Sequence, residues 1–331
     1  MVDRVLSNPD VLAGVCALLR EMFETAPASA AEEATTLYTR IRNLGRPLGL
    51  FDERDYFLGE TALIAATALR FMGKFGDAER WLDRAEAGFR HTINPAPLLA
   101  NLAYARLALR YAVGRYDDVL ELVPSLVTSF GKLGMQREEA KCCFLEAKTL
   151  IQLGRLQESL PMLTSLRDSR VVRGDRILLS HVLIQAGNCF GSVGDFAQAA
   201  SIYEQALPLI QERGPSVVLA ELKWSIGDTY KAQNHLAKAL DAYRAAQRDY
   251  ASLTMETSVA LLHLVAAETL LSLGRHREAE WEILAALPAI EEQKMVTEGF
   301  AAVALLRESV RRRKADPNAL RELREYLQAR K

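Results

Sequence analysis

Apolar and small residues recur along this chain with the spacing of amphipathic helices, in blocks separated by short breaks. Residues 56–72 form one such block, rich in Ala and Leu, and residues 77–89 form the next. The break between them, residues 73–76, begins and ends with glycine. Apolar residues three and four positions apart turn one face of each block toward a core, so this stretch predicts two helices joined by a tight turn.

The same block recurs at intervals of 40 or 41 residues. Its turns are marked by Gly73, Gly114, Gly154, Gly194, Asn234 and Gly274. Gly134, Gly174 and Gly214 each lie 20 residues after one of these anchors, where the second helices are expected to end. Two breaks per period leave room for two helices and none for strands. The pattern is typical of a solenoid of helical hairpins, in which one repeat alone cannot bury its apolar face.

Small residues stand at fixed offsets from the anchors, where two packed helices approach most closely. Seven positions before the anchor come Ala66, Ala147, Gly187, Gly227 and Ala267, and five positions after it come Ala78, Ala199, Ala239 and Ala279. Nine positions after it, larger residues fill the space between helices: Leu82, Tyr203, Tyr243 and Ile283. The repeat around Gly114 departs from this pattern, because Leu107 and Val119 replace the small residues.

These residues resemble the tetratricopeptide repeat family. One repeat carries Trp224, Gly227, Tyr230, Ala239, Tyr243 and Ala246, and the preceding one carries Gly187, Phe190, Gly194, Ala199, Tyr203 and Ala206. The resemblance covers about residues 53–331, although the period is longer than the family's usual 34. It is similar to the longer variant of some bacterial regulators and scaffolds. It implies an all-α, right-handed superhelical solenoid of antiparallel helix pairs, with about six regular repeats.

The two ends depart from the repeat. Residues 1–52 are predicted to form an irregular N-terminal helix pair, opened by Asn8 as N-cap with Pro9 and, for the second helix, by a Ser29–Glu32 capping box. Residues 53–331 are predicted to form one continuous solenoid, closed by a C-terminal capping helix that starts at Pro317.

Charge and composition exclude several classes of function. Lys and Arg number 41 against 42 Asp and Glu, for a net charge of −1, so no overall electrostatic footprint for nucleic acid or an anionic membrane is present. The apolar run at residues 11–19 is too short to span a bilayer. The four cysteines lack ligand spacing and are interpreted as structural thiols of a reducing compartment. The chain is therefore expected in the cytoplasm, with neither membrane nor nucleic acid as the partner of this chain alone.

No catalytic, cofactor-binding or metal-binding constellation is found in the sequence. Phosphate-loop, dinucleotide-binding, zinc-protease and nucleophile-elbow motifs are absent, and the five histidines fall on different repeats without ligand partners at helical spacing. We therefore expect a protein that is not an enzyme and that needs no cofactor.

The concave groove is the predicted partner-binding surface. By the resemblance, the first helix of each repeat lines this groove with the residues ten, six and three positions before the anchor. The residues chosen as candidates are Tyr104, Phe144, Lys148, Ile184, Asn188, Trp224, Asp228, Lys231, Leu264 and Glu268. The lysine with which chaperone-binding members hold a terminal carboxylate is missing from its place.

The sequence favours a non-enzymatic scaffold or adaptor that binds a protein or peptide in this groove. The alternative is a ligand-responsive sensor module of a bacterial transcription or signalling regulator. A helical-bundle phosphatase effector is a third hypothesis. The kind of occupant, whether a helix, an extended peptide or a small molecule, is left open by the sequence, as is the oligomeric state.

Overall fold

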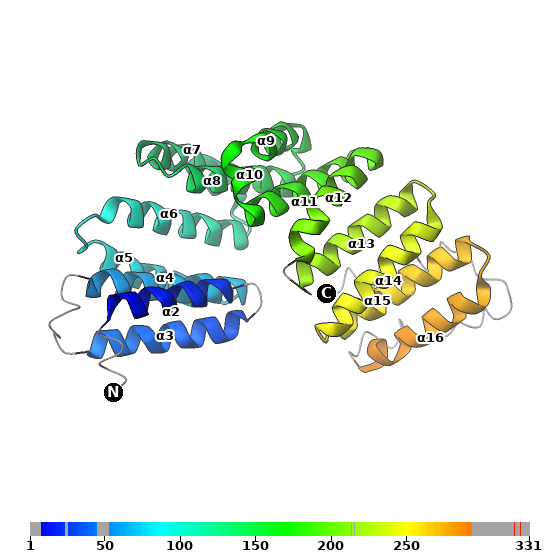
Figure 1. Cartoon of the computed structure of the whole chain (residues 1–331), viewed down its shortest axis with the longest axis horizontal. Coiled ribbons are helices and arrows are strands. Elements are labelled where there is room, and N and C mark those ends of the chain that lie inside the picture. The colour runs from blue at the N-terminus through cyan, green and yellow to red at the C-terminus, as the bar shows by residue number, and fades with distance from the viewer. Residues whose placement is uncertain are drawn as a thin grey trace. The chain divides into compact units, whose positions relative to one another are not determined.

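A computed structural model of the chain describes residues 8–23, 26–44, 53–212, 214, 216–292, 321 and 325 (Figure 1). All regular structure in these residues is helical, as predicted. The chain divides into two compact units, residues 1–172 (unit 1) and 173–331 (unit 2), which are described separately. The predicted domain boundary at residues 52 and 53 lies inside unit 1 and stays a prediction, as does the right-handed twist of the array.

Unit 1 contains an N-terminal helix pair followed by three hairpins. Its helices are α2 (Pro9–Glu21), α3 (Pro27–Asn43), α4 (Arg54–Phe71), α5 (Phe75–Phe89), α6 (Pro95–Ala112), α7 (Tyr116–Lys132), α8 (Gln136–Gln152) and α9 (Leu156–Asp168). The short α10 (Arg170–Gly174) contains the boundary between the units.

Unit 2 contains three further hairpins. Its helices are α11 (Arg176–Ser192), α12 (Phe196–Gln211), α13 (Val217–Ala232), α14 (Leu236–Ser252), α15 (Glu256–Ser272) and α16 (His276–Glu292). The six hairpins of the two units are the six regular repeats that the sequence predicts. The predicted C-terminal capping helix lies outside the described residues apart from Arg321 and Glu325.

Each anchor residue ends the first helix of its hairpin in a left-handed conformation. The φ angles of the five glycines lie between 71° and 84°, and that of Asn234 is 60°. The residue after the anchor donates its backbone N–H to a carbonyl five residues earlier, for example Asp195 to Phe190 at 2.9 Å and His235 to Tyr230 at 2.8 Å. This 6→1 bond of the Schellman motif satisfies a helix-end carbonyl and reverses the chain. Glycine, or asparagine in its place, is therefore needed at the anchor.

In five of the six hairpins, the two facing positions, seven before and nine after the anchor, pair a small residue with a large one. In unit 2, Gly187 faces Tyr203 and Gly227 faces Tyr243, and a Cβ on either glycine would lie 2.4 Å from the tyrosine ring. Where the earlier position is alanine, the later one is Leu or Ile. In the repeat around Gly114 the larger residue, Leu107, comes first and Val123 follows, and both are buried. That repeat therefore reverses the order of sizes and places more side-chain volume at this pair of positions, while both stay apolar.

The N-terminal pair packs against the first hairpin. Leu12, Ile41 and Phe57 belong to one buried cluster, which joins α2, α3 and α4. The predicted start of α2 is confirmed, because the Asn8 side chain accepts from the backbone N–H of Asp10 and Pro9 opens the helix. The predicted Ser29–Glu32 capping box is wrong: α3 begins at Pro27 without a side-chain cap. A proline at the first helical position already has the helical φ and no donor to satisfy.

None of the described helices combines the length and the apolarity that crossing a bilayer requires. The four cysteines form no disulfide, and Cys16, Cys142 and Cys189 are buried.

Candidate functional site

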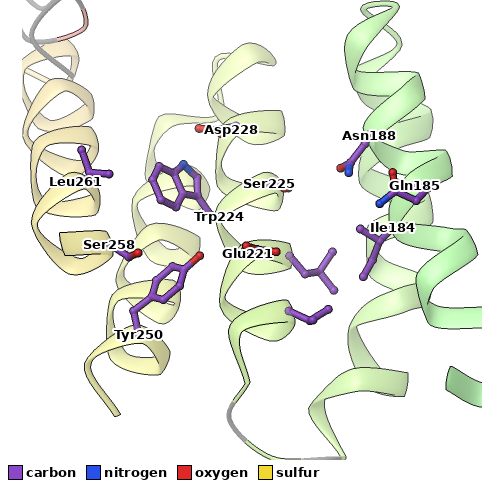
Figure 2. Close-up of a pocket in the computed structure, with 12 residues that line it drawn as sticks. Ile184, Gln185, Asn188, Glu221, Trp224, Ser225, Asp228, Tyr250, Ser258 and Leu261 are labelled. Carbon is purple, nitrogen blue, oxygen red and sulfur yellow. The ribbon is translucent and has the colours of Figure 1, made fainter. Parts of the chain in front are cut away.

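The concave side of unit 2 contains a cavity of about 560 Å3 between the first helices of its hairpins (Figure 2). This volume is in the range of small-molecule and peptide side-chain pockets. Its twelve lining residues come from α11, α13, α14 and α15: Ile184, Gln185, Asn188, Val218, Glu221, Leu222, Trp224, Ser225, Asp228, Tyr250, Ser258 and Leu261. We call this the unit 2 pocket.

Trp224 is the largest apolar side chain of the unit 2 pocket. It is half-buried and packs against two core clusters formed mainly by α14, α15 and α16. Its ring meets Tyr250 edge-on, with centroids 6.4 Å apart and an interplanar angle of 89°. In Figure 2 the indole lies beside Leu261 of α15, with Tyr250 and Ser258 below it. This packing holds one face of a large aromatic ring at the cavity wall.

Two polar groups of the unit 2 pocket are held in place by buried tyrosines. The Tyr203 hydroxyl donates to Oδ1 of Asn188 at 2.6 Å, and the Tyr243 hydroxyl donates to Oδ1 of Asp228 at 2.7 Å. Both tyrosines reach the groove because the facing helix position is glycine. A polar group whose orientation is fixed before binding loses little entropy when a ligand arrives.

The electrostatic character of the unit 2 pocket is acidic. Glu221 and Asp228 are its two charged residues, and none of its twelve lining residues is Lys or Arg. Glu221 is solvent-exposed but lies within the concavity, where partial desolvation raises the pKa of its carboxyl group. Burial, with a contribution from the nearby Glu221, raises the pKa of Tyr250 to about 12, so this hydroxyl is a neutral donor at physiological pH.

The groove positions on α15 are closed by protein contacts. Leu264 and Glu268 are both 1% exposed. The Glu268 carboxylate pairs with Lys231 of α13 at 2.6 Å and with Arg321 at 3.1 Å. These three predicted groove residues, Lys231 included, thus form a packed end beside the unit 2 pocket rather than part of its lining.

Unit 1 has a separate concavity of about 420 Å3, which we call the unit 1 cavity. It is lined by Arg20, Glu60, Leu63, Thr67, Arg70, Phe89, Leu98, Asn101, Tyr104, Ala105, Ala108, Arg137, Glu138 and Lys141. Four of these residues are cationic and two are acidic. Burial raises the pKa of Tyr104 to about 12.

The two other unit 1 candidates, Phe144 and Lys148, lie on α8 next to this cavity. The ammonium of Lys148 is 4.7 Å from the centroid of the Tyr111 ring and 5.8 Å from that of Phe144. Desolvation, and next the positive charge of Arg70, lower the pKa of Lys148. Lys148 therefore sits among aromatic rings and beside another cation.

The structure thus brings four of the predicted site residues into one cavity: Ile184, Asn188, Trp224 and Asp228. Sequence reasoning missed Gln185, Glu221, Ser225 and Tyr250. Gln185 and Ser225 each lie nine positions before their anchors, and Glu221 lies one helical turn further back. They share a face with the chosen offsets, since residues three and four apart on a helix are neighbours. Helical spacing was the signal that would have found these three, whereas Tyr250 lies on α14, a second helix.

No group of three or more His, Cys, Asp or Glu side chains suited to a metal ion occurs in the part of the chain that the structure describes. The buried thiols carry raised pKa values, about 11 for Cys16 and about 12 for Cys142, with desolvation as the main cause. A thiol of this kind is a poor nucleophile. Cys16 and Cys142 are therefore unsuited to nucleophilic catalysis.

The fold and cavities define a class: an all-α array of hairpins like tetratricopeptide repeats, with cavities lined mainly by its first helices. A family model described as soluble NSF attachment protein (SNAP) matches residues 125–286. No curated protein sequence matches the chain.

Solved structures show the same fold at low sequence identity. The apo form of RapI has a TM-score of 0.67 and 9% identity, covering 97% of this chain and 87% of RapI. The Rap conjugation gene regulator of plasmid pLS20, in complex with the Phr* peptide, has a TM-score of 0.57 and 12% identity over 99% of this chain and 94% of its own. BtubC (BKLC) from P. vanneervenii has a TM-score of 0.54 and 19% identity over 70% and 93%. The repeat fold predicted from the sequence is therefore confirmed.

Proposed function

We propose that the chain is a non-enzymatic peptide-binding module that holds a peptide, or a segment of a partner protein, in the unit 2 pocket. The observation that carries this proposal is a cavity of about 560 Å3 with an aromatic wall, Trp224, and polar groups oriented in advance by Tyr203 and Tyr243. An apolar anchor beside a few fixed hydrogen-bonding groups is the usual arrangement of a peptide groove. The module acts in the cytoplasm, where cysteines that form no disulfide stay reduced.

Two solved structures with this fold support the peptide-binding proposal. The pLS20 Rap regulator is described in complex with a peptide, Phr*, and another Rap protein in complex with Competence and Sporulation Factor. Both share the fold of this chain at 12% identity. At least one protein of this fold is therefore described with a bound peptide.

The test is selection of ligands from a random peptide library displayed on phage, with the full chain as bait. Selected peptides are expected to bind the wild type and to lose affinity for Glu221→Lys, which places a cation at the mouth of the acidic pocket. Asp241→Lys, the same exchange at an exposed position of α14 outside the pocket, is the matched control. Selected peptides that bind Glu221→Lys as tightly as the control would show that they bind elsewhere and would overturn the proposal.

A ligand-responsive sensor is the second candidate, and one observation favours it: a structural neighbour that binds a peptide is described as a conjugation gene regulator. The same selected peptide separates the two functions. A sensor changes conformation on binding, so the radius of gyration from small-angle scattering changes when peptide is added. A scaffold gives the same scattering curve with the peptide bound.

A further inference from the structure

Two cations on the concave side of unit 1 have no acidic partner among the described residues. Arg70 ends α4 and Lys148 lies on α8, with Tyr104 and Tyr111 of α6 near them. The guanidinium carbon of Arg70 lies 4.4 Å from the centroid of the Phe71 ring, and Tyr104 is close enough to affect Arg70 electrostatically. The ammonium of Lys148 lies over the rings of Tyr111 and Phe144. No carboxylate contributes to the electrostatics of either residue.

The other cations of the unit 1 cavity each have an acidic neighbour. Arg20 pairs with Glu60 at 2.5 Å, and Glu138 lies 3.9 Å from Arg137 and 3.8 Å from Lys141. Arg70 and Lys148 are therefore the exceptions in an otherwise paired cluster. They also lie close enough to repel each other, since Arg70 is a cause of the lowered pKa of Lys148.

This arrangement costs folding energy. Desolvation lowers the pKa of both Arg70 and Lys148, which means that the folded protein disfavours the charged forms. Cation–π contacts with aromatic rings offset part of the desolvation cost, but the rings supply no counterion. A buried cation is stabilised when an anion with hydrogen-bonding capacity reaches it. Arg70, which lines the cavity, and its neighbour Lys148 are both partly buried, and together they define a site that an anionic ligand would complete.

We propose that unit 1 binds an oxyanion, a carboxylate or a phosphate group, at the Arg70 side of the 420 Å3 cavity and within reach of Lys148. The planar guanidinium of Arg70 matches the paired oxygens of either group, and the ammonium of Lys148 adds a second positive charge. Tyr104 lines this cavity, and the ring of Tyr111 lies 4.7 Å from the Lys148 ammonium. This site lies in a different unit from the unit 2 pocket, and the proposal does not rest on the function proposed for that pocket.

The test uses the amine of Lys148 as its own reporter. The full chain is treated with a trace of an acetylating reagent, and mass spectrometry gives the acetylation rate of Lys148 relative to exposed Lys132. Only the uncharged amine reacts, and an anion beside Lys148 raises its pKa. Each unit of that rise lowers the free amine about tenfold. The rate is compared in chloride, in inorganic phosphate and with a hexaglutamate peptide, at equal ionic strength.

We expect phosphate, hexaglutamate or both to slow the acetylation of Lys148 relative to Lys132. Protection by phosphate alone identifies a phosphate site, protection by hexaglutamate alone a carboxylate site, and protection by both a general oxyanion site. An unchanged ratio with both probes overturns the proposal.

Variants show whether Arg70 takes part. Arg70→Gln should abolish the protection, and Arg70→Lys, which keeps the charge, should retain part of it. Arg80→Gln, at an exposed position of α5, is the matched control and should behave as the wild type. Helicity and the melting temperature of each variant are measured in parallel. Full protection in a folded Arg70→Gln would also overturn the proposal.

Discussion

The two units build concave surfaces of opposite character from the same repeat. In unit 2 the pocket lining is acidic, with Glu221 and Asp228, and the groove cation Lys231 is paired. In unit 1 the cavity is mainly basic, and Arg70 and Lys148 have no acidic partner among the described residues. The backbone of the hairpin fixes where a groove residue stands, and the side chains at a few offsets decide what it binds. Unit 2 thus presents hydrogen-bond acceptors that are oriented before a ligand binds, whereas unit 1 presents two cations without an acidic partner among the described residues.

The largest predicted effect concerns the ion pairs of unit 2. Lys223 of α13 lies 2.5 Å from Asp249 of α14, and the two side chains are only 16% and 14% exposed. Lys223→Met leaves a partly buried carboxylate without its cation, so we expect a loss of about 3 kcal/mol in the free energy of unfolding. Urea denaturation measures it.

The matched control is an exposed pair in the same unit. Arg176 and Glu212 are paired at 2.5 Å but are 57% and 66% exposed, so Arg176→Met should cost less than about 1 kcal/mol. Equal losses for the two variants would show that burial does not distinguish these pairs.

The second prediction addresses the glycine–tyrosine packing that is confined to the hairpins of unit 2. Gly227→Ala places a Cβ 2.4 Å from the Tyr243 ring, and we expect a loss of about 1–3 kcal/mol in stability from overpacking. Gly191→Ala on α11 meets nothing within 4 Å and should gain about 0.5–1 kcal/mol from its higher helix propensity. Thermal melting of both variants shows whether each one is less or more stable than the wild type. A stabilising Gly227→Ala would contradict the packing account.

The smallest effect is expected in unit 1 and has the opposite sign to the loss at Lys223. Desolvation lowers the pKa of Lys148 in the folded state, which means that the charged side chain destabilises the folded protein. This destabilisation is present in full at all pH values below that lowered pKa. Lys148→Met should therefore raise the free energy of unfolding at neutral pH in chloride buffer. The gain should shrink as the pH rises toward 10.5, the ordinary value for lysine, where the unfolded chain also loses its proton.

Denaturant midpoints of wild type and Lys148→Met, measured from neutral to alkaline pH, check this prediction. A lower midpoint for the variant at neutral pH would show that the contacts of Lys148 with Tyr111 and Phe144 outweigh its desolvation.

The repeat fold was predictable because its turns use conformations open to few residues. A left-handed residue at the end of each first helix requires glycine or asparagine, and Gly194 and Asn234 reveal the period for that reason. The N-terminal pair was less predictable. It shares no period with the repeats, and Pro27 opens α3 where the Ser29–Glu32 pattern pointed to a later start.

The candidate site was predictable only in part, because offsets place residues on a face but do not say what covers them. Trp224 and Asp228 line the unit 2 pocket, whereas Glu268, at an equivalent offset, is closed off by Lys231 and Arg321. Contacts from other helices decide this difference, and no single repeat contains them. The tyrosine hydroxyls, by contrast, left a readable signal: a glycine at one offset, a tyrosine at another and a polar residue beside the glycine.

The facing pair of volumes in each hairpin has a consequence for protein engineering. Replacing α14 alone with a helix that carries leucine in place of Tyr243 would open a void above Gly227 and remove the donor to Asp228. Transplanting α13 and α14 together keeps the fit and the hydrogen bond. The hairpin, and not the single helix, is therefore the smallest part that recombination or design can exchange between such arrays while keeping the groove chemistry intact.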